Sequence, residues 1–153
     1  MIFSTPTAYA LRALVELAAR AGNESLMLEE LAVGTDLPRQ FVRKLFAKLV
    51  RAGVLVSSKG RSGGFRLARP AHAISLMQIV SAIDGEDVAT GCALKLDRCS
   101  DAEPCAQHDL YKPIRQRLVD YLQTTTLADL SASLKSKPAW RELCGKSASK
   151  EHA

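Results

Sequence analysis

The sequence lacks any apolar stretch long enough to cross a bilayer, and its N-terminus lacks the charged, then apolar, then small pattern of a signal peptide. We therefore expect no membrane partner and a cytoplasmic location. Catalytic patterns are missing as well: there is no Ser/His/Asp or Cys/His arrangement, no phosphate loop and no paired-carboxylate motif. These absences predict a protein that is not an enzyme and has no small-molecule substrate.

Acidic residues are missing from one long segment. Between Leu37 and Arg69 the chain has nine basic residues and no acidic one, whereas from Leu76 onward ten basic residues stand against eleven acidic ones. A solvated charged face usually mixes both signs, so a one-sided block inside a folded segment indicates a polyanionic partner. The block favours nucleic acid over a plain charged surface.

Apolar periodicity predicts a mainly α chain with a small β-wing. A first helix is expected between Ser4 and Gly22, followed by a short helix, a tight turn at Gly34 and a longer helix over about residues 38–52. In that longer helix the apolar residues fall on one face and the polar residues on the other. The apolar face consists of Val42, Leu45, Phe46 and Leu49, and the polar face of Gln40, Arg43, Lys44, Ala47 and Arg51.

Two short strands, 54–58 and 65–68, are predicted to flank a glycine-rich basic turn, "SKGRSGGF". A compact helix then ends near Gly85, and a long apolar-faced helix begins near Asp109 with Pro113 in its first turn, where the missing N–H costs little. We divide the chain into residues 1–84, a cysteine-rich segment 85–108, a helical region 109–133 and a flexible tail 134–153.

A helix, a tight turn, a second helix and a basic hairpin follow one another in the order typical of a winged helix-turn-helix. A helix fits the major groove of duplex DNA, where Arg pairs with guanine and Gln with adenine. The small cationic hairpin tip lets the backbone approach phosphates, and its Arg61 is suited to a narrow minor groove. The alternatives are an amphipathic core helix and a plain hairpin, and each feature alone is a weak signal.

The segment "GCALKLDRCSDAEPCAQHD" holds three of the four cysteines and one of the three histidines. The spacing of Cys92, Cys99, Cys105 and His108 permits zinc, an iron–sulfur cluster or thiol redox chemistry. Structural zinc sites favour a CxxC pair, which the chain lacks, and a widely spaced trio suits a larger object such as a cluster. The residues alone leave cluster and zinc about equal, with a thiol–disulfide switch third.

Together "YALRALVELA", "LPRQFVRKLFAKLVRAGVLVSSKGRSGGFRLARP", "ISLMQIVSAIDG" and the trailing cysteines resemble the Rrf-two family of winged-helix iron–sulfur transcriptional regulators, which includes IscR, NsrR and RirA. The resemblance covers about residues 1–134. It implies a homodimer held by the long C-terminal helix, here about residues 109–123. It also implies binding to a double-stranded DNA operator that depends on the state of a cluster in the cysteine segment.

The resemblance also assigns DNA contacts by position. Arg39, Gln40, Arg43 and Lys44 are expected on the recognition helix, Lys59, Arg61 and Ser62 on the wing, and Ser4, Thr5 and Tyr9 near the phosphates. Family members often have glutamate where this chain has Arg43, so its preferred operator is expected to differ.

The resemblance makes Cys92, Cys99 and Cys105 cluster ligands, and the position of His108, three residues past Cys105, matches the IscR branch and implies a [2Fe–2S] cluster. In the NsrR branch an acidic residue before the N-terminal tyrosine serves a [4Fe–4S] cluster, and Ala8 occupies that place here. We therefore favour [2Fe–2S] over [4Fe–4S]. We further hypothesise that cluster assembly orders the segment and resets the angle between two winged domains, which must match the spacing of two half-sites.

Overall fold

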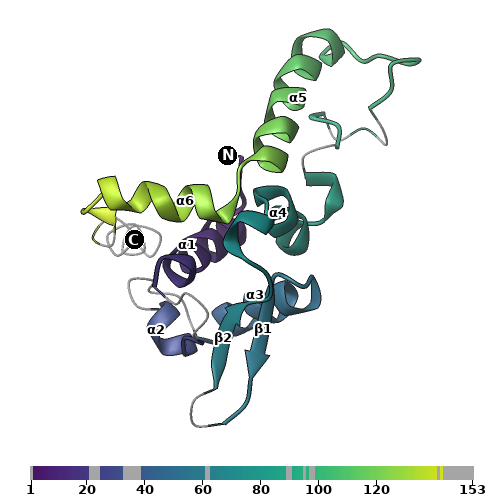
Figure 1. The fold of residues 1–153 in the computed structure, drawn as a ribbon. Helices are drawn as coiled ribbons and strands as arrows, with labels where there is room; N and C mark the ends of the chain where they lie inside the picture. Colours follow the sequence, from purple (N-terminus) through teal and green to yellow (C-terminus); the bar gives the residue numbers. More distant parts are fainter. Residues whose placement is uncertain are drawn as a thin grey trace, which may run out of the picture.

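The structure is a computed structural model that describes residues 2–20, 25–32, 39–60, 63–88, 91–94, 96, 99–140 and 142. Figure 1 shows a body of helices with a two-stranded hairpin at one end and a long helix that projects from the other. This architecture confirms the mainly α prediction with a small β-wing. The elements are α1 Thr5–Arg20, α2 Leu28–Ala32, α3 Arg39–Arg51, β1 Leu55–Ser58, β2 Gly64–Leu67, η1 Ala71–Ala73, α4 Leu76–Asp84, η2 Glu86–Val88, α5 His108–Thr124, α6 Leu127–Ser133 and η3 Leu134–Ser136.

The core lies between α1, α3, α4 and the C-terminal α6. Helix α3 buries the four residues predicted for its apolar face, because positions three and four apart share one side of a helix. Its Phe46 is fully buried and meets the ring of Phe65 edge-on, with the ring centroids 4.9 Å apart. This aromatic contact fixes the wing (β1, β2 and the residues between them) against α3.

The wing is an antiparallel hairpin in which Leu55 pairs with Leu67 and Ser58 with Gly64. Its strands agree with the predicted ones within one residue. Leu26 extends the sheet through two backbone hydrogen bonds with Phe65, of 2.9 and 2.8 Å. A Cβ at Gly64 would clash with the carbonyl oxygen of Leu26, so glycine is required where these two backbone segments lie this close together. The tip residues Arg61 and Ser62 and the predicted turn at Gly34 lie outside the described residues.

Helix α4 begins at a capping box, because the Ser75 hydroxyl accepts a hydrogen bond from the backbone N–H of Gln78 while the Gln78 side chain accepts one from the Ser75 N–H. It ends at Gly85, as predicted from the sequence. The φ of this residue is 98°, a conformation that residues other than glycine rarely adopt. None of the described helices is long and apolar enough to cross a membrane.

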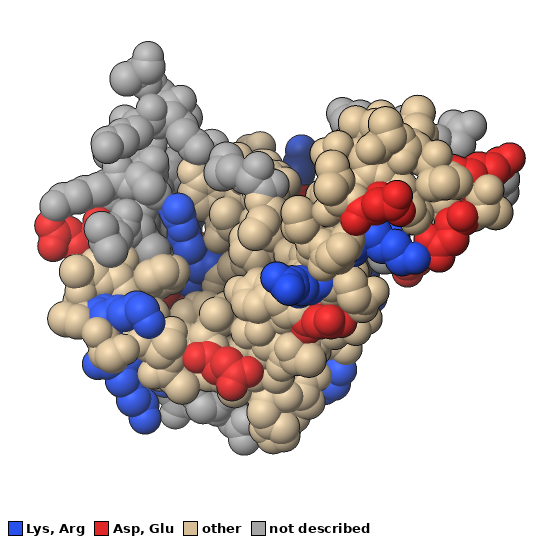
Figure 2. Space-filling model, turned by 90° about the horizontal axis from the view of Figure 1, so that it is seen from above, with Lys and Arg blue, Asp and Glu red and all other residues tan. Residues whose placement is uncertain are grey.

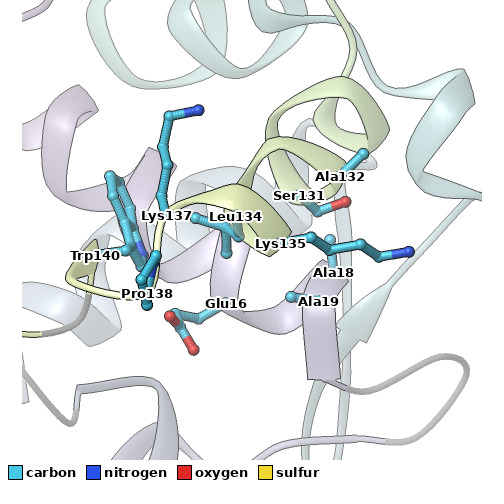
Figure 3. Close-up of a pocket in the computed structure, with 10 residues that line it drawn as sticks. All are labelled: Glu16, Ala18, Ala19, Ser131, Ala132, Leu134, Lys135, Lys137, Pro138 and Trp140. Carbon is cyan, nitrogen blue, oxygen red and sulfur yellow. The ribbon is translucent and has the colours of Figure 1, made fainter.

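Helix α5 begins at His108, one residue before the predicted start, and accommodates Pro113 near its N-terminus. The segment expected to be a flexible tail differs in its first part from that expectation, because Leu134 and Trp140 pack against the core. Trp140 and the residues around it line a pocket of about 520 Å³ beside α1. Figure 3 shows these side chains. None of the predicted site residues lines this pocket.

Candidate nucleic-acid interface and cysteine centre

The N-terminal half of α3 presents the residues predicted for base contacts. The side chains of Arg39, Gln40, Arg43 and Lys44 are all exposed. The Arg39 guanidinium forms an ion pair with Glu29 of α2, which ties the two helices at their surface. Lys59, directly after β1, is exposed as well. The outer face of α3 and the residue next to the wing tip therefore carry exposed donor groups, of which the Arg39 guanidinium is engaged with Glu29.

The three residues predicted near phosphates are placed differently from one another. Thr5, the first residue of α1, is exposed, whereas Tyr9 belongs to the core with 6% of its surface exposed. The Arg12 guanidinium lies 5.1 Å from the centroid of the Tyr9 ring. Ser4 is half-buried, and its hydroxyl donates a hydrogen bond to Asp84. Of the three, Thr5 has the open position that a phosphate contact needs.

Charges of both signs lie on the upper face of the molecule. Figure 2 shows basic and acidic side chains interspersed on the face seen from above, with acidic ones gathered at the end of the projecting part of the molecule. That end contains the cysteine loop, defined here as residues 91–107, and the start of α5 (Figure 1). It lies away from the wing, so the predicted DNA contacts of α3 and the wing and the predicted cysteine ligands lie at separate ends of the molecule.

The four predicted metal ligands lie together at this end. Cys92, Cys99, Cys105 and His108 all line one small pocket at the start of α5. The three thiols are partly buried and not disulfide-bonded, and the imidazole is 7% exposed. Free space inside the pocket is about 10 Å³, close to what one water needs.

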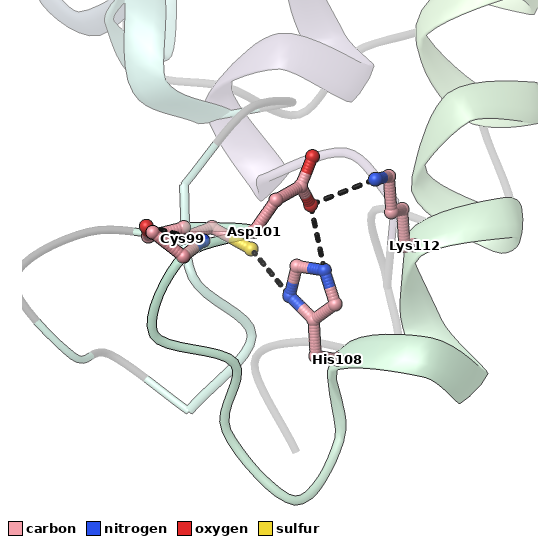
Figure 4. Close-up of polar contacts among 6 residues, drawn as sticks. Cys99, Asp101, His108 and Lys112 are labelled. Carbon is pink, nitrogen blue, oxygen red and sulfur yellow. Dashed lines mark hydrogen bonds and ion pairs between the residues drawn. The ribbon is translucent and has the colours of Figure 1, made fainter.

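His108 is oriented by a polar network, which Figure 4 shows. Its Nδ1 lies 3.7 Å from Cys99 Sγ, and its Nε2 lies 2.8 Å from Asp101 Oδ1. Since an ionised carboxylate only accepts hydrogen bonds, Nε2 carries a proton, and in the neutral ring the lone pair of Nδ1 is directed to the cysteine side. Lys112 Nζ also donates to Asp101 Oδ1, at 2.7 Å.

Two groups of this end have shifted pKa values. Hydrogen bonds from Lys112 and then His108 hold the pKa of Asp101 below its ordinary value, which keeps it an acceptor. The pKa of the Cys92 thiol is lowered mainly by hydrogen bonds from the backbone N–H groups of Leu96 and Leu94. A lowered pKa favours the thiolate, the form that binds metals and reacts with oxidants.

The donor set fits an iron–sulfur cluster chemically, because three thiols and one neutral imidazole nitrogen supply the ligand types that such clusters use. In the described part of the chain, no group of three or more His, Cys, Asp or Glu side chains is arranged to hold a metal ion. The four donors nevertheless line one pocket, whose free space is about that of one water.

Comparison with known proteins identifies the family to which this chain belongs. A family model for Rrf2, described as an iron-dependent transcriptional regulator, matches residues 3–133. The chain belongs to the Rrf2 family. The HTH-type transcriptional regulator IscR of Vibrio campbellii is 30% identical over 122 residues, which cover 80% of this chain and 72% of that one. The protein is therefore a DNA-binding transcriptional regulator, and no catalytic function is indicated.

Solved structures agree with this assignment. CymR, the global cysteine regulator of B. subtilis, superposes with a TM-score of 0.70 and 27% identity, over 86% of this chain and 96% of that one. The oxidized form of Staphylococcus aureus CymR matches with a TM-score of 0.67 and 29% identity, over the same shares. Two kinds of Rrf2 regulator, IscR and CymR, are thus similar to this chain.

Sequence reasoning missed the residues that support the predicted ligands. Asp101 and Lys112 orient His108, and neither was a candidate site residue. A carboxylate and an ammonium that flank a histidine at distances of seven and four residues are too common in sequences to indicate a role. Their significance lies in the fold, which brings Asp101 to His108 Nε2 and Lys112 of α5 to the same Asp101 oxygen.

Proposed function

We propose that this Rrf2 regulator acts as a cytoplasmic homodimer whose affinity for a duplex operator is set by an iron–sulfur cluster bound at Cys92, Cys99, Cys105 and His108. The observation that carries the proposal is the shared pocket of these four side chains at the start of α5. Support also comes from the family description, which is iron-dependent transcriptional regulation.

On the DNA side, Gln40, Arg43 and Lys44 are the proposed groove-reading residues, because they project from the outer face of α3. Arg39 joins them only if its ion pair with Glu29 opens, which costs little at an exposed site. The family resemblance implies six further DNA contacts, which are Lys59, Arg61, Ser62, Ser4, Thr5 and Tyr9. Among those described, the exposed Lys59 and Thr5 are best suited to phosphate contacts.

Dimerisation is proposed through α5. Leu110, Ile114 and Tyr121 are 73%, 61% and 43% exposed, and their spacing places them along one side of the helix. A monomer that leaves such a stripe in water is unusual, whereas two copies related by a two-fold axis cover it with the same surface on each. The dimer in turn matches an operator with two half-sites.

The assembly of an iron–sulfur cluster depends on the supply of iron and on redox conditions, so a bound cluster would make the regulator responsive to both. The chain's own contribution is to ligate it through thiolates, with Cys92 favoured as a thiolate by its lowered pKa. Asp101 holds the His108 ring with Nδ1 directed to the cysteines. His108 as fourth ligand, with Ala8 unable to ligate, favours [2Fe–2S] over [4Fe–4S].

A second candidate is a thiol switch without a cluster. The side chains of Cys92 and Cys105 interact, Cys99 lies 3.7 Å from an imidazole nitrogen, and the similarity to CymR includes an oxidized form. In this reading two thiols give two electrons and two protons to a peroxide, which forms the disulfide and two waters. A zinc site is less favoured because structural zinc sites favour a CxxC pair, which the sequence lacks.

The test combines metal analysis with DNA binding. The chain is purified and reconstituted without oxygen, a duplex is selected from a random library, and iron, sulfide, visible absorption and duplex affinity are measured in both loaded and unloaded states. We expect bound iron and sulfide in about equal amounts and an operator affinity that changes at least tenfold on loading. Cys99→Ser should abolish loading, while the matched Cys144→Ser, in a cysteine outside the ligand set, should not.

An iron-free protein whose duplex affinity changes with peroxide instead would replace the cluster by the thiol switch. A protein whose affinity for the selected duplex is the same in every state of its cysteines would refute both versions.

A further inference from the structure

Helix α4 connects the two ends of the molecule that the proposed function must couple. It packs against α1 and α3, which carry the proposed DNA contacts, and against α5, which begins at His108 (Figure 1). Its C-terminal turn, Ile83 and Asp84, is also where the chain leaves for the cysteine loop. Coupling between distant sites requires packed elements that both sites contact, and α4 has that position.

Asp84 binds the start of α1 with both carboxylate oxygens. Oδ1 accepts a hydrogen bond from the Ser4 hydroxyl at 2.6 Å, and Oδ2 accepts one from the Thr7 hydroxyl at 2.7 Å. The Ser4 hydroxyl in turn accepts from the backbone N–H of Thr7 at 3.2 Å, the arrangement of a helix N-cap. Thr7 is completely buried, so its hydroxyl depends on Asp84 for a partner in this structure.

The same turn of α4 also binds the recognition helix. Lys48 Nζ donates a 2.7 Å hydrogen bond to the carbonyl oxygen of Ile83, one of the last carbonyls of α4. An ammonium at a helix C-terminus is favoured by the helix dipole as well. One turn of α4 thereby fixes both the N-terminus of α1 and the C-terminal half of α3.

Cys92 comes only eight positions after Asp84 in the sequence. The first residue between them has a backbone conformation that residues other than glycine rarely adopt. Gly85 has a φ of 98°, and it is followed by the short helix η2. Beyond it the Gly91 N–H donates to the Asp87 carbonyl oxygen at 2.7 Å. The first cysteine therefore lies close in sequence to the end of α4, and η2 and the hydrogen bond between Gly91 and Asp87 come between them.

We propose that Asp84 is a positioning residue that transmits the state of the cysteine loop to the DNA-binding surface, with Lys48 as its counterpart on the recognition helix. The proposal rests on the proposed function, because it names the residues through which the cysteine loop would change operator affinity. When the loop opens to hold its ligand, the end of α4 moves, and the Asp84 and Lys48 hydrogen bonds carry α1 and α3 with it. Removing these bonds uncouples operator affinity from the loop.

The experiment measures the ratio of operator dissociation constants between the cluster-loaded and cluster-free full-length chain, using the duplex selected with the wild type. Allosteric ratios of about 5 to 150 are common, and we expect one of that order for the wild type. Asp84→Asn and Thr7→Val should each reduce the ratio at least threefold, and Thr7→Ser, which keeps the hydroxyl, should restore it. The matched control is Asp129→Asn, because Asp129 also accepts from a threonine hydroxyl, at 2.6 Å in the cap of α6.

Lys48→Met separates the two roles open to this residue. If Lys48 transmits the loop state, the ratio falls and the salt dependence of binding is unchanged. If Lys48 instead contacts a phosphate, affinity falls equally in both states and the salt slope drops by about one, which would overturn its part of the proposal.

The outcomes separate the two levels of inference. A wild-type ratio of one refutes the proposed function, and the coupling with it. A wild-type ratio above five that survives both Asp84→Asn and Thr7→Val overturns the role of Asp84 alone, as does an equal loss in Asp129→Asn. Circular dichroism and thermal unfolding check that each variant folds, and Thr7→Val decides the matter if Asp84→Asn does not.

Discussion

Different interactions stabilise the winged part of the molecule (α1 to α4 with the wing) and the cysteine loop. In the winged part, Phe46 and Leu49 are fully buried, and Phe65 packs edge-on against the Phe46 ring. In the cysteine loop, Leu94 and Leu96 are 52% and 53% exposed, and the contacts around His108 are polar. Burial of apolar surface stabilises the first region without any ligand, whereas the second has little apolar burial of its own.

This difference suits a sensor. A region with few buried apolar contacts opens at low free-energy cost, so its conformation follows whatever it binds. A well-packed region moves as a unit and reports that change at a distance. The first experiment below alters the winged part, the second alters the exposed face of α5, which follows the cysteine loop, and the third alters the N-terminal cap of α6, the helix that packs on α1.

The largest effect is expected in the winged part. Phe46→Ala removes a fully buried ring and its edge-on contact with Phe65, and should lower the free energy of unfolding by about 3–5 kcal/mol. Chemical denaturation followed by circular dichroism measures this. The control is Ala47→Ser, at the exposed neighbouring position, which should stay within about 0.5 kcal/mol of the wild type. A loss below about 1 kcal/mol for Phe46→Ala would contradict the idea that this packing defines the region.

A smaller effect is expected on α5, where the exposed stripe would be covered only in the dimer. Ile114→Asp places an unpaired charge on that face and should weaken dimerisation by at least about 2 kcal/mol, roughly a thirty-fold rise in the dimer dissociation constant. Sedimentation equilibrium measures it, and Ile114→Met, which keeps the side chain apolar, is the matched control. Since Ile114 is 61% exposed in one chain, the unfolding of the monomer should hardly change. An unchanged dimer would place the interface elsewhere.

How far the sequence predicts this structure follows the same division. The apolar face of α3, the wing strands and the start of α5 were predicted within one residue, because each has a clear periodicity or a terminating residue. The packing of Trp140 was not predicted, because an isolated aromatic residue in a polar segment has no periodic pattern. Burial of Tyr9 and the Ser4–Asp84 hydrogen bond also need the tertiary fold, since the bonded residues are 80 positions apart.

For the cysteine centre, the ligand candidates came from residue type and spacing, and the structure brings all four to one pocket. Their supporting residues could not be predicted, since the described residues of the loop that positions Asp101 beside His108 form no helix or strand. The DNA contacts stay a prediction, and the structure shows that the four residues predicted for α3 are exposed. Which of those side chains are already engaged, as Arg39 is with Glu29, depends on how α2 packs on α3.

The smallest expected effect concerns the cap of α6, the helix that packs on α1. Hydrogen bonds from the Thr126 hydroxyl, and then from its backbone N–H, lower the pKa of Asp129 below its ordinary value of 3.8. Because the folded-state pKa lies below the unfolded one, the ionised cap contributes stability above pH 3.8, and that contribution is lost as the pH falls through the lowered value. Asp129→Asn should therefore lower the melting temperature slightly at pH 6, and the difference from the wild type should shrink below pH 3.8. Melting curves from pH 6 to pH 2.5 measure this difference. A difference that stays constant over this range would mean that the side chain acts through its shape and neutral hydrogen bonds, with no contribution from its charge.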